Sequence, residues 1–351
     1  MRHLTYILTL FCFSGLLLSC QQTAPPRLEY AKSFEEIAHL AAAEGKHFAI
    51  VLASPDCPAC QILYLRLHNK TRSVISKDII FNIIDVTLPQ NRWYSQLIQS
   101  GARPTTLVFC PDAQLQAIIQ GASHSGIDCL KNVLNGNIDC APFYNNIPFP
   151  ESVSYNDMIR TLNLILTAKH KIERGEDAVE KLEKALTILY YPFPLWLKIQ
   201  NEYNLGYTED AIMWARQMLT FQSPLHTRLY SDLFLAARKV INPYFDIATM
   251  PTLAVETNRV YLGELQKGDE MDFRITLTNT GKEPLLIHHI DVGCSCLELQ
   301  NNIPREIAPN QEIYLHLLFT AERQGEIRRN VRITNNGLTA VETIAIRANV
   351  L

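Results

Sequence analysis

The residues best placed to carry chemistry are Cys57 and Cys60, which are separated by Pro58 and Ala59. An apolar segment over 48–53 precedes them and predicts a buried strand, and leucines at helical spacing follow them and predict a helix. Cys57 is therefore expected at a helix N-terminus, where unpaired backbone N–H groups and the helix dipole favour a thiolate. A second thiol three residues later can attack the mixed disulfide that the first thiol forms. The spacing thus predicts thiol–disulfide exchange.

Two other interpretations of this cysteine pair are open: half of a zinc site, or a structural disulfide. A zinc ribbon needs a second pair of Cys or His ligands at a similar spacing. The next candidate ligands, Cys110, Cys129 and Cys140, do not repeat the spacing. We therefore favour redox chemistry, and we expect neither a bound metal nor a cofactor.

Length and composition describe a chain with several packed domains. Its 351 residues leave room for two or three domains, and a hydrophobic content of 47% supports packed cores rather than disorder. The formal net charge is only -3 and no basic tract is present, so we expect no nucleic-acid partner. Beyond the first 20 residues, no stretch of sequence is long and apolar enough to span a bilayer.

The N-terminus has the pattern of an export signal, with an apolar stretch over 4–18 that is too short for a spanning helix. This stretch ends in LLSC, which resembles the lipobox of bacterial lipoproteins and implies that Cys20 is acylated. We expect a signal peptide over 1–20 and a tether over 21–27. An ordinary secretory signal with an incidental cysteine is the alternative. The mature protein is then expected in the cell envelope, lipid-anchored and facing the periplasm, with the outer membrane slightly favoured over the inner.

Export changes how the other cysteines are interpreted, because disulfides persist in an oxidising compartment. Seven cysteines follow Cys20, which is an odd number. If Cys57 pairs with Cys60, and the two cysteines near residue 295 pair with each other, three remain. Among these three we favour a bridge between Cys129 and Cys140.

The segments around the cysteine motif predict an α/β sheet with helices on both faces. Ser33 and Glu36 form a capping box that begins a helix, and Gly45 ends it. Further elements are expected over 78–88 (strand), 93–100 (helix), 105–109 (strand) and 114–120 (hairpin strand).

A cysteine motif after a buried strand, followed by GARPTT (101–106) before another strand, resembles the thioredoxin fold over about residues 28–140. Within that superfamily, SFEEIAHLAAAEGK and IIDVTL are similar to the periplasmic thioredoxin-like domains of disulfide reductases. The resemblance implies that Pro104 is the cis-proline beside the dithiol. It also implies that Arg103, Pro104 and Thr105 line the edge where an extended substrate pairs. The residues themselves show only a proline that starts a strand, which is tolerated there.

Two residues depart from the pattern of that family. Val51 stands six residues before Cys57, where the family often has a buried carboxylate that takes the proton from the second thiol. Asp56 replaces the aromatic residue that usually precedes the first cysteine, and an acidic neighbour raises the pKa of a thiol. A weak or specialised reductase is therefore as plausible as a general one.

Residues 151–245 are expected to be helical, because apolar residues recur there at three-to-four spacing. A Gly-to-Ala pattern repeats, with Ala178 and Ala211 33 residues apart, close to the ~34-residue tetratricopeptide period. The segment resembles two degenerate helical-hairpin repeats. Two repeats rarely stand alone, so we expect these helices to pack on a neighbouring domain. A peptide-binding groove is one interpretation, and a plain helical spacer is the favoured one.

Residues 250–351 switch to a period of two, which predicts several short strands and hence a β-sandwich. The apolar positions that alternate are Met271, Phe273, Ile275, Leu277, Ile313, Leu315, Leu317, Phe319, Ile344 and Ile346. The strings LTNTG, PLLI, CSC and IAP, in this order, resemble a bacterial immunoglobulin-like family of unknown function, so no activity follows from the resemblance. The family usually has Gly where this chain has Ser295.

Cys294 and Cys296 have three interpretations. The favoured one is a local staple or unpaired thiols. The second is an accessory redox pair for Cys57 and Cys60, since a C-x-C bridge closes a tight ring that is expected to be strained and easily reduced. The third is a soft-metal site with His288 or His289.

The sequence thus predicts a multidomain exported lipoprotein. It combines an α/β thioredoxin-like domain (28–145), an all-α helical-repeat-like middle (151–245) and an all-β immunoglobulin-like sandwich (250–351). Cys57 would attack substrate disulfides and Cys60 would resolve the mixed disulfide. The expected partners are protein thiols or disulfides of the envelope and an electron donor. The competing hypothesis is a non-catalytic periplasmic binding or scaffold lipoprotein that uses the helical and immunoglobulin-like modules.

Overall fold

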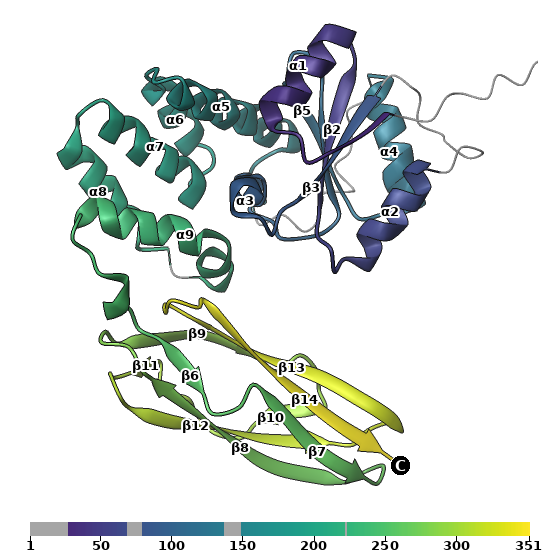
Figure 1. Cartoon of the computed structure of the whole chain (residues 1–351), viewed down its shortest axis with the longest axis vertical. Helices are drawn as coiled ribbons and strands as arrows, with labels where there is room; N and C mark the ends of the chain where they lie inside the picture. Colours follow the sequence, from purple (N-terminus) through teal and green to yellow (C-terminus); the bar gives the residue numbers. More distant parts are fainter. Residues whose placement is uncertain (1–26, 69–78, 137–148, 222) are drawn as a thin grey trace, which may run out of the picture.

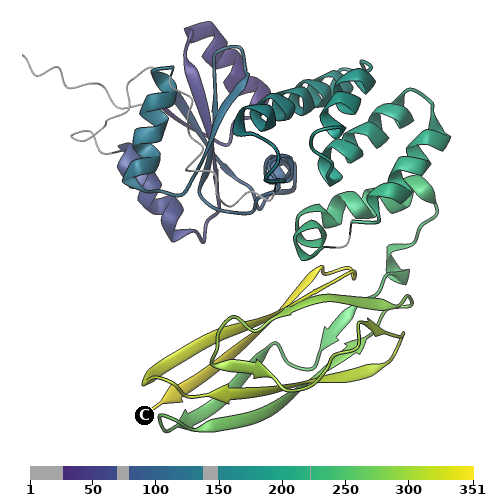
Figure 2. The same cartoon turned by 180° about the vertical axis from the view of Figure 1, so that it is seen from behind.

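A computed structural model describes residues 27–68, 79–136, 149–221 and 223–351. The described chain is multidomain and mixed α/β: a sheet flanked by helices, then a run of helices, then a β-rich C-terminal region (Figures 1 and 2). No helix within these described ranges is long and apolar enough to cross a membrane.

The first sheet has five strands in the order β1-β3-β2-β4-β5. Its first three strands run parallel to one another, and β4 and β5 are antiparallel to their neighbours. The strand bounds are β1 Arg27–Tyr30, β2 His47–Ala53, β3 Ile79–Asp85, β4 Thr105–Phe109 and β5 Leu115–Gln120. The strands predicted near 48–53, 105–109 and 114–120 are therefore confirmed.

Helices cover both faces of this sheet (Figure 1). Side chains of α1 (Phe34–Glu44) and α3 (Arg92–Leu97) pack in one buried cluster, and those of α2 (Pro58–His68) and α4 (His124–Leu134) pack in another on the opposite face. The predicted capping box is present, because the Ser33 hydroxyl accepts the Glu36 N–H and the Glu36 carboxylate accepts the Ser33 N–H. Gly45 ends α1 in the left-handed conformation, as expected.

Two predicted elements are shorter than expected. The strand predicted to run to residue 88 ends at Asp85, because the Asp85 carboxylate accepts the backbone N–H and the hydroxyl of Thr87 and so turns the chain. The helix predicted to reach residue 100 ends at Leu97, and Gln99 has a φ of 51°, which is incompatible with a helix. Strand β1 and helix α4 were not predicted.

Five helices follow: α5, α6, α7 and α9 contribute to the buried cluster of the first sheet, whereas α8 packs in a separate cluster with side chains of α7 and α9. Their bounds are α5 Tyr155–Glu173, α6 Val179–Leu186, α7 Pro192–Asn204, α8 Thr208–Met218 and α9 Pro224–Ile241. The buried Tyr191 hydroxyl donates to Leu97 O (2.6 Å), and the buried Tyr230 hydroxyl donates to Gln96 O (2.9 Å). The expectation that these helices pack on a neighbouring domain is therefore confirmed.

The repeat positions named from the sequence have equivalent environments. Ala178 and Ala211 are both buried, and Gly175 and Gly206 both have left-handed φ values after a helix. The helical pairs α6–α7 and α8–α9 each form contacting hairpins. The periodicity thus reflects two similar helix pairs.

The C-terminal region consists of two sheets around one buried cluster (Figure 1). One sheet has the order β10-β12-β8-β6 and the other β11-β9-β13-β14-β7. The strands are β6 Leu253–Val255, β7 Arg259–Leu265, β8 Glu270–Asn279, β9 Leu285–Asp291, β10 Leu297–Leu299, β11 Glu306–Ile307, β12 Glu312–Thr320, β13 Gly325–Asn335 and β14 Val341–Val350. The predicted alternation is confirmed, since Ile275, Leu315 and Ile344 are all fully buried.

Asn279 holds the first turn of this region together, which explains the LTNTG string. Its side chain is fully buried. The amide nitrogen donates to Glu283 O (2.9 Å) and Ile307 O (3.0 Å), and the amide oxygen accepts the N–H groups of Gly281 (3.0 Å) and Thr252 (3.3 Å). One buried amide thereby satisfies four backbone groups that would otherwise lose hydrogen bonds.

We expect Gly281→Ala to destabilise the protein by about 2–3 kcal/mol. A Cβ at this position would lie 2.2 Å from Met250 O and 2.6 Å from Pro251 Cα, and both of these are backbone atoms that cannot rotate away. The measurement is urea denaturation of the full chain followed by circular dichroism. Lys282→Ala, at an exposed neighbouring position, is the control. Equal unfolding midpoints for the two variants would contradict this close packing.

Candidate active site

Cys57 lies immediately before α2, at the N-cap of that helix. Its carbonyl accepts the N–H groups of Cys60 (3.1 Å) and Gln61 (3.3 Å), and Pro58 occupies the first helical position, where proline needs no partner for its nitrogen. The Cys60 N–H also donates to Cys57 Sγ (3.1 Å). A sulfur that accepts a hydrogen bond at a helix N-terminus is stabilised as a thiolate.

The two cysteines form a disulfide, with their Cα atoms 5.2 Å apart. Each cysteine is only 8% exposed, so both sulfurs lie at the margin of the surface rather than in the open. Asp56, the preceding residue, is exposed. The predicted pairing of Cys57 with Cys60 is present.

The segment 103–105 lies at the same edge of the sheet as the cysteine motif. Strand β4 begins there, with Thr105 in register with Leu52 near the end of β2. The Arg103–Pro104 peptide bond is cis, as the family resemblance implied. Thr105 is fully buried and its hydroxyl donates to Ala102 O (2.8 Å), so this side chain holds the loop and is not available to a substrate. Arg103 is exposed.

An apolar cavity of about 410 Å³ adjoins Cys60. Val51 lines it and is itself buried, so this residue does occupy a buried position beside the second cysteine. The lining residues are Val51, Ala53, Ser54, Pro55, Cys60, Gln61, Leu63, Tyr64, Leu65, Leu67 and Ile83. No carboxylate is among them, so none of these described side chains can accept the Cys60 proton as a carboxylate would.

A second cavity, of about 480 Å³, lies where the first sheet meets α9. Three arginines line it: Arg92, Arg103 and Arg228. Val86 also lines it and donates its N–H to Ala53 O (3.1 Å), which places the cavity along the same sheet edge as the cysteine motif. Arg92 is 3.8 Å from Asp232, whereas Arg103 and Arg228 form no ion pair with any described residue. The cavity is therefore suited to an anionic group.

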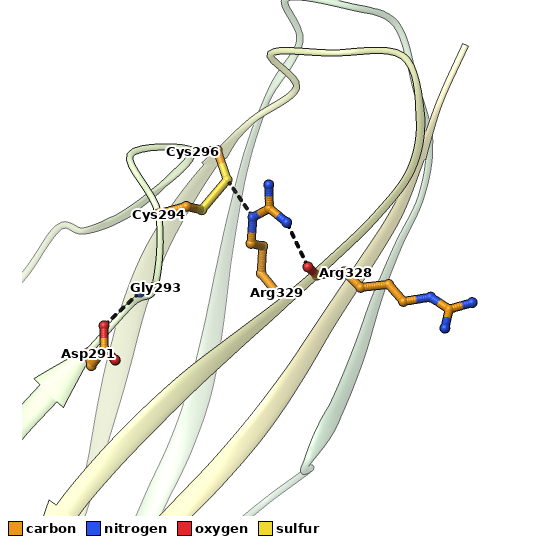
Figure 3. The surroundings of a disulfide bond; sticks show 6 residues. All are labelled: Asp291, Gly293, Cys294, Cys296, Arg328 and Arg329. Atoms are coloured by element: carbon orange, nitrogen blue, oxygen red, sulfur yellow. Dashed lines mark hydrogen bonds between the residues drawn. A yellow bond between two sulfur atoms is a disulfide. The ribbon is translucent and has the colours of Figure 1, made fainter. Parts of the chain in front are cut away.

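The second cysteine pair, Cys294 and Cys296, also forms a disulfide (Figure 3). The favoured interpretation allowed either a local staple or unpaired thiols, and this disulfide excludes the unpaired thiols. Arg329 Nε donates to Cys296 Sγ (3.3 Å). The sequence did not reveal this arginine, because it lies 33 residues away on β13 and carries no local signal. Because each sulfur is bonded to the other, neither is a thiolate ligand of the kind that the soft-metal interpretation requires, and among the described residues neither His288 nor His289 forms a three-ligand cluster with them.

Among the described residues, one group could hold a metal ion. The ligand atoms of Glu35, His170 and Glu173 lie within 4.8 Å of one another. Glu173 is already engaged by Lys169, whose Nζ is 2.5 Å from the carboxylate. Burial and the Lys169 charge lower the pKa of His170, which keeps this ring neutral and able to act as a ligand.

Of the other cysteines, Cys129 is disulfide-bonded, and the described ranges do not contain its partner. Its expected partner, Cys140, lies outside these ranges, as does Cys20, the expected lipidation site. Cys110 is the free cysteine of the described part of the chain. Burial, followed by a hydrogen bond to Asp112, raises the pKa of Cys110 to about 11.

We expect native Cys110 to react with iodoacetamide at pH 8 at least about a hundredfold more slowly than an ordinary thiol, because a thiol with so high a pKa is almost wholly protonated there. The measurement is peptide-level mass spectrometry with the disulfides intact. Asp112→Asn should increase the rate, since it removes the negative charge beside the sulfur. Equal rates in the native and the urea-unfolded protein would contradict this environment.

Comparison with known proteins gives one family match. Residues 253–350 match a family described as a protein of unknown function (DUF1573). No protein with a curated description matches the chain.

Solved structures resemble parts of the chain. A protein of unknown function from Porphyromonas gingivalis W83 is 20% identical with a TM-score of 0.27. The match covers 31% of this chain and 50% of that protein, so this chain spans about half the length of that protein. Thioredoxin NaTrxh from Nicotiana alata is 18% identical with a TM-score of 0.26, covering 32% of this chain and 95% of that one. Thioredoxin f from spinach chloroplast is 15% identical with a TM-score of 0.26, covering 33% and 96%. The chain is thus similar to DUF1573 proteins over its C-terminal region and to thioredoxins over about a third of its length.

Proposed function

We propose that residues 28–145 form a thioredoxin-like domain and that Cys57 and Cys60 catalyse thiol–disulfide exchange. The observation that carries this proposal is the hydrogen bond from the Cys60 N–H to Cys57 Sγ at the start of α2. The strand order β1-β3-β2-β4-β5, with helices on both faces, supports the fold. Pro104 at the same sheet edge supports the site.

The exchange proceeds in two steps. The Cys57 thiolate attacks one sulfur of a substrate disulfide, and the other substrate sulfur leaves as a thiolate. Cys60 then loses its proton and attacks Cys57 Sγ, which releases the second substrate thiolate and leaves the Cys57–Cys60 disulfide. The substrate gains two electrons and the dithiol loses them. A thiol or dithiol donor in the envelope is required to regenerate the enzyme.

We propose that the substrate docks along the edge formed by Arg103 and Pro104, close to the cavity lined by three arginines. Two of these guanidinium groups have no ion-pair partner among the described residues, which favours substrates with carboxylates near the disulfide. Side chains on α9 contribute to this cavity. The helical region therefore adds to the docking surface rather than acting only as a spacer.

We further propose that Cys20 anchors the protein to a membrane and that the protein faces the periplasm. The lipobox-like sequence supports this location. The C-terminal region, with its two sheets around one core, is proposed to be an immunoglobulin-like sandwich.

The alternative function is a non-catalytic binding or scaffold lipoprotein. Val51 favours it, because no carboxylate lines the cavity beside Cys60 among the described residues. The small exposed fraction of both cysteines also favours it.

We expect the protein to accelerate the reduction of insulin by dithiothreitol, and Cys57→Ser to abolish the acceleration, because Cys60 alone lacks the position at the helix N-terminus. Turbidity of the released insulin B chain measures the rate. Cys110→Ser is the matched control, since it removes a cysteine that is not at the site. Equal rates for the native protein and Cys57→Ser would support the scaffold alternative.

Val51→Asp is expected to speed turnover by at least about tenfold, because a carboxylate beside Cys60 can take its proton during the second step. Val51→Asn has nearly the same shape but cannot act as this base, and it is the control for any change in packing. The readout is the insulin rate together with the amount of mixed disulfide trapped by acid. If the Asp and Asn variants turn over equally, proton removal from Cys60 does not limit the reaction.

A further inference from the structure

The Cys294–Cys296 disulfide lies in the loop between β9 and β10, and its two sulfurs have different environments (Figure 3). Cys296 is only 4% exposed, and its Sγ accepts a hydrogen bond from Arg329 Nε (3.3 Å). Cys294 is half-buried and has no such donor among the hydrogen bonds of the described residues. An incoming thiolate therefore reaches Cys294 more easily than Cys296.

The charge of Arg329 is not neutralised by a carboxylate of the described chain. Its second nitrogen donates to the backbone oxygen of Arg328, whose own guanidinium is paired with Glu326. Asp291, the acidic residue drawn in Figure 3, lies at the end of β9, accepts the Gly293 N–H and pairs with Arg332 (3.5 Å). A guanidinium bonds weakly to a neutral disulfide sulfur and strongly to a thiolate. The hydrogen bond from Arg329 to Cys296 is thus strongest once the disulfide has opened and Cys296 is a thiolate.

The bridge contributes little to holding the loop. A disulfide between residues only two apart closes a very short loop, and the stabilisation from a crosslink grows with the length of the loop. Backbone bonds already hold both cysteines, since the Thr320 N–H donates to Cys296 O (3.0 Å) and the Leu297 N–H donates to Cys294 O (3.3 Å). A purely structural role therefore explains poorly why the bridge is there.

We propose that Cys294–Cys296 is a second redox-active disulfide, which a dithiol reduces by attack at Cys294 while Arg329 stabilises Cys296 as the leaving thiolate. A donor thiolate bonds to Cys294 Sγ, the Cys294–Cys296 bond breaks, and its electron pair stays on Cys296. The second donor thiol loses its proton and attacks the mixed disulfide, which releases Cys294. The donor ends as a disulfide, and the loop gains two electrons.

The donor is a dithiol by chemical class, and it need not come from this chain. The reduced Cys57–Cys60 pair belongs to that class, but the proposal does not depend on the activity of that pair. A redox-active role for Cys294–Cys296 also differs from the local structural staple that the sequence favoured.

The test uses the full chain with Cys57 and Cys60 both replaced by Ser, so that loss of the first site cannot affect the result. Dithiothreitol reduces the protein, acid and an alkylating reagent stop the reaction, and peptide mass spectrometry follows Cys294 and Cys296. Arg329→Gln is expected to slow reduction about three- to tenfold, because a poorer leaving thiolate departs more slowly. Arg329→Lys should restore part of the rate. Arg328→Gln, a neighbour whose guanidinium faces Glu326, should leave the rate unchanged.

The site of attack is mapped separately in the protein that keeps Arg329, so this result does not depend on how the variants fold. Brief treatment with a monothiol such as glutathione, followed by acid, should leave the adduct on Cys294. An adduct mainly on Cys296, or Arg329→Gln reduced as fast as Arg328→Gln, would overturn the proposal.

Discussion

The hydrogen bond from the Cys60 N–H to Cys57 Sγ is the interaction on which the account of the first site depends. It requires that β2 ends and α2 begins within a few residues, so that the sulfur meets the unpaired N–H groups of the helix. The buried strands on both sides of β2 fix where the helix starts. The sheet therefore supplies position, and the helix N-terminus supplies the stabilisation of negative charge.

The helical region makes this site different from that of an isolated α/β domain. Tyr191, at the start of α7, and Tyr230 of α9 bond to the backbone of α3, so both helices are held against the α/β region. Arg228 of α9 then faces the same cavity as Arg103. Helix α9 also contacts β13, so the helical region touches both the α/β region and the C-terminal sheets (Figures 1 and 2). The chain thus carries the Cys57–Cys60 disulfide in its α/β region and the Cys294–Cys296 disulfide in its C-terminal region.

Local signals in the sequence were enough to predict most of the elements around the site. The capping box at Ser33 and the alternation in β8 and β12 depend on neighbouring residues, so they can be identified without a structure. Strand β1 was missed because it has only four residues, with both ends exposed. Arg329 and the three-arginine cavity could not be predicted, because they depend on strand register and helix packing between residues far apart in sequence.

The most direct test of the central claim compares the two cysteines of the reduced motif. In the disulfide form the two residues are equally exposed, at 8% each, so a large difference between their rates is not expected from access alone. Brief alkylation of the reduced full chain near pH 7, followed by peptide mass spectrometry, gives the two rates. The account predicts that Cys57 is modified at least about tenfold faster than Cys60. Equal rates, or faster modification of Cys60, would contradict it.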